Sequence, residues 1–587
     1  MSWKIVVLWL VLVATAVAAD GPYAWPLDLP TRYLTSNFLE TRGGRFHTGI
    51  DLKTEERTGV AVRAVADGWI SRIKFAPTGY GKALYLTDAT GRTFVYAHLE
   101  RLADPLRERV RREQADRGRY RVDLMLAPGE LPVRRDEVLA LSGQTATTGP
   151  HLHFEVRDAD GSPLNPRRHG FASVDSLPPD ILAVRVWWGN RSYCAGDGTV
   201  PLHGALPTLR LPAGELGVSA RLVERSDPLR YRLEPYRISL GVDGWGVVGA
   251  GCNERLRWAD VRRERVVFRE TELGREQVFW TPRAGGDWTG SGHGPGRPDD
   301  PPGTRRTYRL AAEDAAGNRS EVWWDVIVDP EAADVGSPGG RAATAAEVAA
   351  DQPASILDLG AAVYGEAETA GGGGGSVGIL RAPLVAGEVP PFEPLGEPVW
   401  YLPEHPFPYE HLVEPCPWCS RRWPASATRR WRSTGIRAGW TYEAAPERRD
   451  GRWTFPLDNP GAHLLGRDTT PPVIDGPRRR TVPAADGPRR RHGIGLARWE
   501  LVPVTLTDGA SGIDWDAVTV LLDGVPLVAE PDAPRDRLLI ELPDALPPGE
   551  HRLTVTACDL AGLTTEATLT VRLTAGPPDG DPATGGE

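Results

Sequence analysis

The sequence predicts a mostly β protein built from several domains. Its 587 residues correspond to roughly four domains at about 150 residues each. Glycine and proline, with 66 and 54 residues, favour short strands joined by turns over long helices. Hydrophobic residues at 41% and charged residues at 25% are typical of folded globular proteins, which excludes a disordered polymer and a multi-span membrane protein.

The N-terminus and the net charge indicate where the protein works. Lys4 precedes an apolar run over residues 5–19 that ends in small residues, which is the pattern of a secretory signal peptide and too short for a membrane helix. No later segment approaches 18 apolar residues. A formal net charge of −10 argues against nucleic acid as the main partner. We therefore expect an exported protein, periplasmic, secreted or at the cell surface, with no membrane span after signal removal.

The first domain is expected over residues 20–175 as a compact antiparallel β domain. Short alternating runs, such as 61–65 and 83–87, are separated by glycine and aspartate turns. The run HLHFEV at 151–156 alternates strictly, so a strand there places His151, His153 and Glu155 on one face and three apolar residues on the other. One face of this strand is therefore expected to be core and the other a site.

The polar residues of this domain are those of a metal site. A catalytic zinc ion needs three protein ligands from histidine and carboxylate side chains, and His47, Asp51 and His153 meet that count. His151 then lies one strand repeat, about 7 Å, from the third ligand, close enough to act without ligating the metal. His98 ends another expected strand.

Four separated motifs resemble the lysostaphin-type (LytM-like) zinc metalloendopeptidases, which cut peptide bonds in bacterial peptidoglycan. They are HTGID at 47–51, GYG at 79–81, YAHL at 96–99 and TGPHLHFE at 148–155, and the likeness covers about 36–166. The resemblance implies Zn²⁺ held by His47, Asp51 and His153, with His98 and His151 as the pair that activates water and stabilises the transition state. Which of the two histidines takes which role stays open.

The sequence departs from the family between His98 and residue 133, where about thirty residues replace a short turn. Asp104 and Pro105 are expected to begin a helix that stops at Gly118, followed by a strand over 120–126. Residues 101–135 hold ten arginines against six acidic residues. A solvated helix is the preferred interpretation. The alternative is a wall or lid that meets carboxylates of a peptide substrate.

Two later regions repeat three patterns in the same order. PPDI at 178–181 corresponds to PPVI at 471–474, and Asp-Gly pairs follow at 243–244 and 523–524. DAAGN at 314–318 corresponds to DLAGL at 559–563, each between alternating segments, which predicts a hairpin turn. This pattern resembles bacterial immunoglobulin-like β-sandwiches and implies that two or three such modules follow the first domain.

These observations divide the chain into seven segments. They are a signal peptide (1–19), a lysostaphin-type zinc peptidase domain (20–175), an immunoglobulin-like β-sandwich (178–332), a Gly/Ala-rich linker (333–378), a β module of uncertain type (379–468), a second immunoglobulin-like β-sandwich (469–575) and a disordered tail (576–587). Of five cysteines, Cys416 and Cys419 form the only close pair and predict a local disulfide. Cys194 and Cys252 are the other candidate pair.

The expected function is hydrolysis of peptide cross-links or stem peptides of peptidoglycan by a zinc-activated water. Peptidoglycan peptides are then the partner, together with a possible regulatory envelope protein. One alternative is a catalytically inactive envelope protein that binds and activates a cell-wall hydrolase, but all five expected side chains are present. Another is an adhesin-like binding protein, although no motif in the sandwiches names a ligand.

Overall fold

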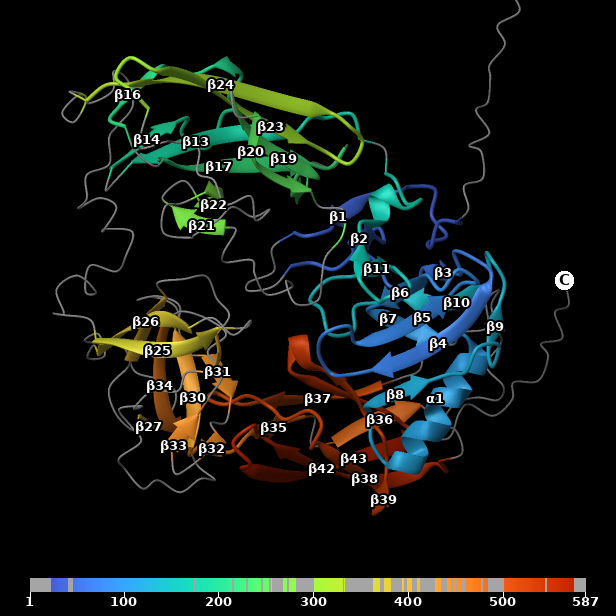
Figure 1. The fold of residues 1–587 in the computed structure, drawn as a ribbon. Helices are drawn as coiled ribbons and strands as arrows, with labels where there is room; N and C mark the ends of the chain where they lie inside the picture. The colour runs from blue at the N-terminus through green and yellow to red at the C-terminus, as the bar shows by residue number, and fades with distance from the viewer. Residues whose placement is uncertain are drawn as a thin grey trace, which may run out of the picture.

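The structure is a computed structural model that describes residues 23–40, 46–173 and, with internal gaps, 175–332, 363–483 and 501–574. The described residues are mostly strands, which confirms the predicted fold class (Figure 1). None of the described helices is long and apolar enough to cross a bilayer. The predicted signal peptide, the C-terminal tail and the pair Cys416 and Cys419 lie outside the described residues.

The first domain contains two antiparallel sheets. The larger one has nine strands, with the order β1 (Leu34–Ser36), β2 (Ile50–Lys53), β11 (His151–Arg157), β6 (Thr93–Ala97), β5 (Lys82–Thr87), β4 (Gly68–Phe75) and β8 (Val122–Met125), while β12 (Pro163–Leu164) pairs with β11 and β9 (Pro132–Val133) with β4. The smaller one joins β3 (Ala61–Arg63), β10 (Val138–Ser142) and β7 (Leu99–Leu102). Alternate residues of the central strands, such as Leu152, Phe154 and Tyr96, are fully buried in one core.

The charged insertion forms a helix and an edge strand. Helix α1 (Asp104–Arg117) begins one residue earlier than an Asp104 N-cap would place it, because Ala103 is the N-cap, and it ends at Gly118 with a left-handed φ of 61°. Leu106 and Val110 of α1 are buried, and β8 pairs with β4. One face of α1 is therefore packed on the first domain, and most of its other residues are exposed, as predicted for a solvated helix. Some of its arginines also pair with Glu541 of the C-terminal part of the chain, which the sequence did not predict.

Residues 175–332 form two sheets that share one core, which we call the first sandwich. One sheet has the order β14 (Arg191–Ala195), β13 (Asp180–Trp188), β17 (Leu216–Arg225), β22 (Gly274–Trp280) and β21 (Phe268–Thr271), with β18 (Arg232–Leu233) beside β17. The other has β15 (Gly204–Ala205), β24 (Arg319–Val328), β23 (Arg305–Glu313), β19 (Arg237–Val242) and β20 (Gly246–Cys252), with β16 (Leu209–Leu211) beside β24.

Residues 468–574 form a second such unit, the last sandwich. One sheet has the order β35 (Val473–Asp475), β37 (Leu501–Thr507), β41 (Arg537–Glu541) and β40 (Glu530–Asp532). The other has the order β36 (Arg479–Pro483), β43 (Thr564–Thr574), β42 (Gly549–Cys558), β38 (Thr519–Leu522) and β39 (Val525–Pro526). The two repeated turn patterns are hairpins in both sandwiches: β19–β20 matches β38–β39, and β23–β24 matches β42–β43.

Between the sandwiches lies a sheet that corrects the predicted linker. Its order is β29 (Tyr409–His411), β25 (Val363–Thr369), β26 (Gly374–Arg381), β28 (Val399–Pro403), β34 (Gly461–Arg467), β30 (Thr428–Ser433) and β31 (Thr441–Ala444), with β27 (Glu393–Pro394) beside β34 and a separate hairpin of β32 (Glu447–Arg449) and β33 (Arg452–Thr454). Residues 333–362 of the predicted linker lie outside the described residues, whereas β25 and the first part of β26 fall in its remainder and pair with each other. Composition misses such strands because ladder hydrogen bonds need backbone groups, not large side chains.

The structure also decides one of the cysteine predictions. Cys194 and Cys558 are both thiols. The candidate disulfide between Cys194 and Cys252 is therefore not formed. Cysteine counting could not decide this, because a disulfide depends on the distance and direction between two β-carbons.

Candidate metal centre

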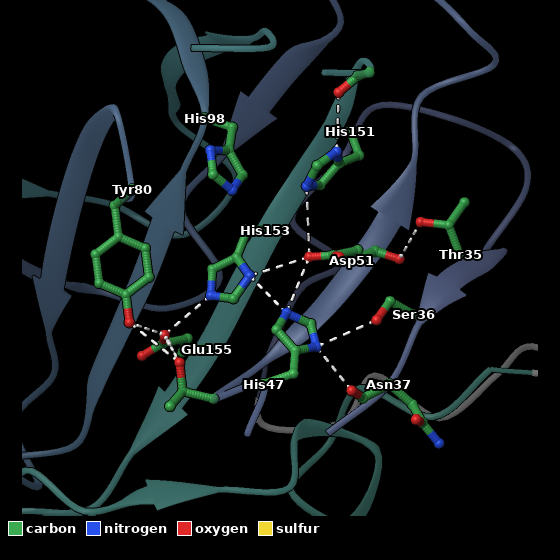
Figure 2. Close-up of polar contacts among 12 residues, drawn as sticks. Thr35, Ser36, Asn37, His47, Asp51, Tyr80, His98, His151, His153 and Glu155 are labelled. Atoms are coloured by element: carbon green, nitrogen blue, oxygen red, sulfur yellow. Dashed lines mark hydrogen bonds and ion pairs between the residues drawn. The ribbon is translucent and has the colours of Figure 1, made fainter. Parts of the chain in front are cut away.

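Two adjacent strands bring the three predicted ligands together. Strand β11 lies beside β2 with His153 directly opposite Asp51. His47 lies in the segment just before Ile50, the first residue of β2. The three side chains are 6%, 3% and 4% exposed for His47, Asp51 and His153. Figure 2 shows them converging on one point from these neighbouring strands. Residues about a hundred positions apart therefore form one buried cluster because of strand register.

The distances within this cluster fit a tetrahedral metal. His47 Nε2 lies 2.8 Å from His153 Nδ1 and 3.2 Å from Asp51 Oδ1, and His153 Nδ1 lies 3.0 Å from Asp51 Oδ1. Ligands about 2.0–2.1 Å from a tetrahedral zinc ion are about 3.3 Å apart. The three atoms thus form a triangle close to one face of that tetrahedron, and two nitrogens with one carboxylate oxygen are a zinc donor set.

Hydrogen bonds fix which nitrogen of each histidine faces the cluster. His47 Nδ1 donates to the carbonyl oxygen of Asn37 at 2.7 Å, so its Nε2 carries the lone pair. His153 Nε2 donates to Glu155 Oε1 at 2.9 Å, so its Nδ1 faces the other two atoms. Three electron pairs therefore meet at one point, an arrangement that only a proton or a cation stabilises.

The electrostatics of the cluster agree with this assignment. Burial by itself would raise the pKa of Asp51, but the three histidines around it hold that pKa well below its ordinary value. Burial lowers the pKa of His153, yet hydrogen bonds to Asp51 and Glu155 raise it to about 9. The site therefore favours a positive charge between its three atoms, which a proton or a metal ion supplies.

A buried carboxylate supports the third ligand. Glu155 is fully buried, accepts hydrogen bonds from Thr48 Oγ1 at 2.6 Å and from the Tyr80 hydroxyl, and pairs with Arg157. Burial would raise the pKa of Glu155, but Arg157 and His153 lower it, so the group stays ionised. A carboxylate behind a ligating histidine orients the ring and increases its basicity. The sequence placed Glu155 on the site face but assigned it no role.

His98 and His151 lie beside the cluster without joining it. Their rings are 4.8 Å apart, centre to centre. His98 Nδ1 donates to the carbonyl oxygen of Thr145 at 2.8 Å, and His151 Nδ1 to that of Gly149 at 3.0 Å. The other ring nitrogen of His151, Nε2, lies 3.6 Å from Asp51 Oδ1. Figure 2 shows both rings on the same side of the cluster. Burial and the neighbouring histidines lower the pKa of His98 to about 3, which keeps its ring neutral.

Two motif glycines allow the close packing around the site. A β-carbon on Gly49 would lie 2.4 Å from the carbonyl oxygen of Phe154, because β2 and β11 approach closely there. A β-carbon on Gly81 would lie 2.5 Å from the carbonyl oxygen of Thr145, the group that orients His98, and Gly81 has a φ of +61°. Both positions therefore require glycine.

Comparison with known proteins gives only distant structural likenesses. No family model matches the chain, and no curated protein does. The complex of SpoIIIAH and SpoIIQ matches with 21% identity and a TM-score of 0.19, over 25% of this chain and 99% of that one. A zinc-containing peptidase from Vibrio cholerae matches with 25% identity and 0.19, over 26% and 40%. The catalytic domain of the prophage-encoded M23 protein EnpA from Enterococcus faecalis matches with 23% identity and 0.18, over 24% and 93%.

Proposed function

We propose that this chain is an exported zinc metalloendopeptidase that hydrolyses peptide cross-links or stem peptides of bacterial peptidoglycan. The observation that carries the proposal is the buried triangle of His47, Asp51 and His153 with two further histidines beside it. The motif resemblance supplies the substrate class, and the apolar N-terminal run supplies the export. The distant neighbours add no weight, because their TM-scores are 0.20 or less.

The residues around the cluster divide the chemistry of peptide-bond hydrolysis between them. Zinc, when bound by His47, Asp51 and His153, supplies Lewis-acid activation of water and of the substrate carbonyl. His98 is neutral, and its Nε2 lone pair accepts the proton that water loses. The same nitrogen returns that proton to the leaving amine. His151, whose Nδ1 already donates to Gly149, donates from Nε2 to the oxyanion that develops on the carbonyl when both of its ring nitrogens carry a proton.

Zinc content tests the ligand assignment directly. The full chain is expected to bind one zinc per molecule, and His153→Ala is expected to lose it. His203→Ala is the matched control, since His203 is exposed and lies outside the site. Elemental analysis of the three proteins measures bound zinc. Mass spectrometry of the fragments released from purified peptidoglycan measures hydrolysis. Equal zinc in wild type and His153→Ala would refute the assignment.

The two non-ligand histidines are tested by rate and metal content together. His98→Ala and His151→Ala are each expected to lower the hydrolysis rate about 10²- to 10⁴-fold, the range for losing a general acid–base group. Zinc should stay at one per chain in both variants, because neither ring belongs to the triangle. Loss of zinc in either variant would mean that a ligand has been taken for a catalytic residue.

A further inference from the structure

We propose that the last sandwich binds a calcium ion between Asp468, Asp508 and Asp559. One carboxylate oxygen of each residue lies within 4.8 Å of the other two. Asp468 and Asp559 are only 5% and 1% exposed. The three residues come from the start of the sandwich, from the end of β37 and from the β42–β43 turn. This cluster lies outside the candidate zinc site and plays no part in the proposed hydrolysis.

Several buried oxygens at this cluster have no hydrogen-bond partner. Asp508 Oδ2 accepts from the backbone nitrogens of Ala510 and Gly512, whereas its Oδ1 has none. Asp559 Oδ1 accepts from the backbone nitrogen of Leu563, whereas its Oδ2 has none. The buried hydroxyl of Ser511, whose backbone nitrogen donates to Asp468 Oδ2, is also unpartnered. Buried polar atoms of this kind are rare in proteins unless water or an ion contacts them.

The charges at the cluster are all of one sign. All three side chains are carboxylates, and one oxygen of each lies within 4.8 Å of the other two. Three carboxylates packed this closely and withdrawn from water repel each other. A cation between them removes the repulsion and supplies the unpartnered oxygens with a ligand at once.

The first sandwich has acidic residues at the three corresponding positions, and two of them contact the cationic side chain of Arg167. Asp175 and Asp468 each precede a Pro-Pro pair by three residues, and Asp314 and Asp559 each open the matched hairpin turn. The register of the strand pairs identifies the third pair of corresponding residues, Glu224 and Asp508. Asp180 lies opposite Val223 as Val473 lies opposite Thr507, so Glu224 and Asp508 occupy the same place on matched strands.

In the first sandwich, side chains contact all three of these acidic groups, and among them only Glu224 Oε2 is a buried oxygen without a hydrogen-bond partner. Arg167 of the first domain inserts its guanidinium and contacts Glu224 at 2.5 Å and Asp175 at 2.6 Å. Asn318 Nδ2 donates to Asp314 Oδ2 at 2.7 Å. In the last sandwich, Leu563 stands at the position of Asn318, and its side chain has no hydrogen-bond donor. Asp559 Oδ2 is therefore left bare at the point where Asp314 Oδ2 is bonded.

The donor set selects calcium among common cations. All the available ligand atoms are oxygens, which hard divalent cations prefer. Calcium takes six to eight oxygens in irregular geometry, whereas magnesium requires a near-ideal octahedron. Asp508 and Asp559 each use one oxygen to accept hydrogen bonds from backbone nitrogens, which fixes the direction of the other oxygen. An ion that tolerates irregular geometry therefore fits these carboxylates better.

Calcium binding to the zinc-loaded full chain tests the inference. Equilibrium dialysis with radioactive calcium is expected to show one site with a dissociation constant of about 10⁻⁴ to 10⁻³ M, the range of extracellular modules. Asp559→Asn should weaken binding at least about tenfold. Glu566→Gln, which removes one exposed negative charge from the same sandwich, should bind calcium as the wild type does. Zinc content is measured in parallel and should not change.

Three outcomes would overturn the proposal. The first is a folded wild type that binds no calcium at concentrations up to about 5 mM, well above the expected dissociation constant. The second is equal calcium binding by wild type and Asp559→Asn, or by wild type and Asp508→Asn if Asp559→Asn does not fold. The third is equal occupancy by magnesium at the same concentration, which would refute the choice of calcium.

Discussion

The two sandwiches share a pattern of strands and turns but contact the first domain in different ways. The first sandwich receives Arg167, whose side chain is 3% exposed and pairs with Glu224 and Asp175, both nearly fully buried. The last sandwich contacts the first domain through several ion pairs that are at least partly exposed, from Lys82 with Glu530, at 10% and 28% exposed, to Arg121 with Asp516, at 40% and 46%. The same architecture therefore makes a fully buried ionic contact in one case and a partly exposed one in the other.

Each sandwich also touches a segment next to the proposed zinc site. Glu234 of the first sandwich exchanges two hydrogen bonds with the side chain of Asn37, whose carbonyl oxygen accepts from His47. Arg535 of the last sandwich donates to Gln144 Oε1 at 2.6 Å and to the carbonyl oxygen of Thr148 at 2.8 Å. The loop over 144–148 precedes His151 and includes the carbonyl group that orients His98. The two sandwiches thus contact two different segments beside the site.

The largest expected effect comes from breaking the buried anchor. Arg167→Met leaves two buried carboxylates without their cation, and such a loss costs about 3–5 kcal/mol. Arg121→Met removes an exposed pair worth about 0–1 kcal/mol. Differential scanning calorimetry of the full chain should therefore show a large fall in the lowest transition temperature for the first variant and almost none for the second. Similar shifts in both would remove the distinction between the two contacts.

A smaller effect is expected on the proposed activity when the last sandwich releases the loop over 144–148. Arg535→Ala removes two hydrogen bonds from a charged donor, each worth about 1.5–3 kcal/mol, only part of which reaches the site. We expect the hydrolysis rate to fall about threefold to tenfold with zinc retained. Arg552→Ala, which removes an exposed arginine from the same sandwich, is the control. A rate unchanged by Arg535→Ala would show that the contact is structural only.

Salt separates the two contacts without any mutation. Raising the ionic strength from about 0.1 to about 1 M shortens the screening length from about 10 to about 3 Å, which weakens exposed pairs far more than buried ones. Hydrogen exchange should therefore accelerate along α1, where Arg111 meets Glu541, and just before β8, where Arg121 meets Asp516. It should stay constant around Arg167. Equal acceleration in both regions would contradict the comparison.

The local pattern of the sequence predicted the site far better than the packing between domains. Alternation along 151–156 placed His153 on the site face, and strand register then brought it opposite Asp51, as a strand assignment allows. The role of Glu155 was missed because alternation separates two faces but does not show that both are buried. The local sequence pattern also could not show that the helix in the insertion meets Glu541, more than four hundred residues away, since such contacts depend on tertiary structure.

The smallest expected effect is a pH dependence confined to the last sandwich. His551 Nδ1 lies 2.7 Å from Asp523 Oδ2, and this hydrogen bond raises the pKa of His551 above its ordinary value. The stabilisation is therefore complete below about pH 6.5, the ordinary histidine value, and is lost as the pH rises through the raised pKa. In the first sandwich the matched Asp243 lies 3.9 Å from Arg309, which stays charged throughout this range.

The variant Asp523→Asn tests this difference with little strain, because the residue has a left-handed φ of 50°, which asparagine tolerates well. It should remove the fall in the transition temperature of the last sandwich between about pH 6 and pH 8, an effect of at most about 1 kcal/mol for a pair so near the surface. Asp243→Asn should leave the pH profile unchanged. If Asp523→Asn keeps the wild-type profile, the pH dependence arises elsewhere, and the two sandwiches do not differ at this turn.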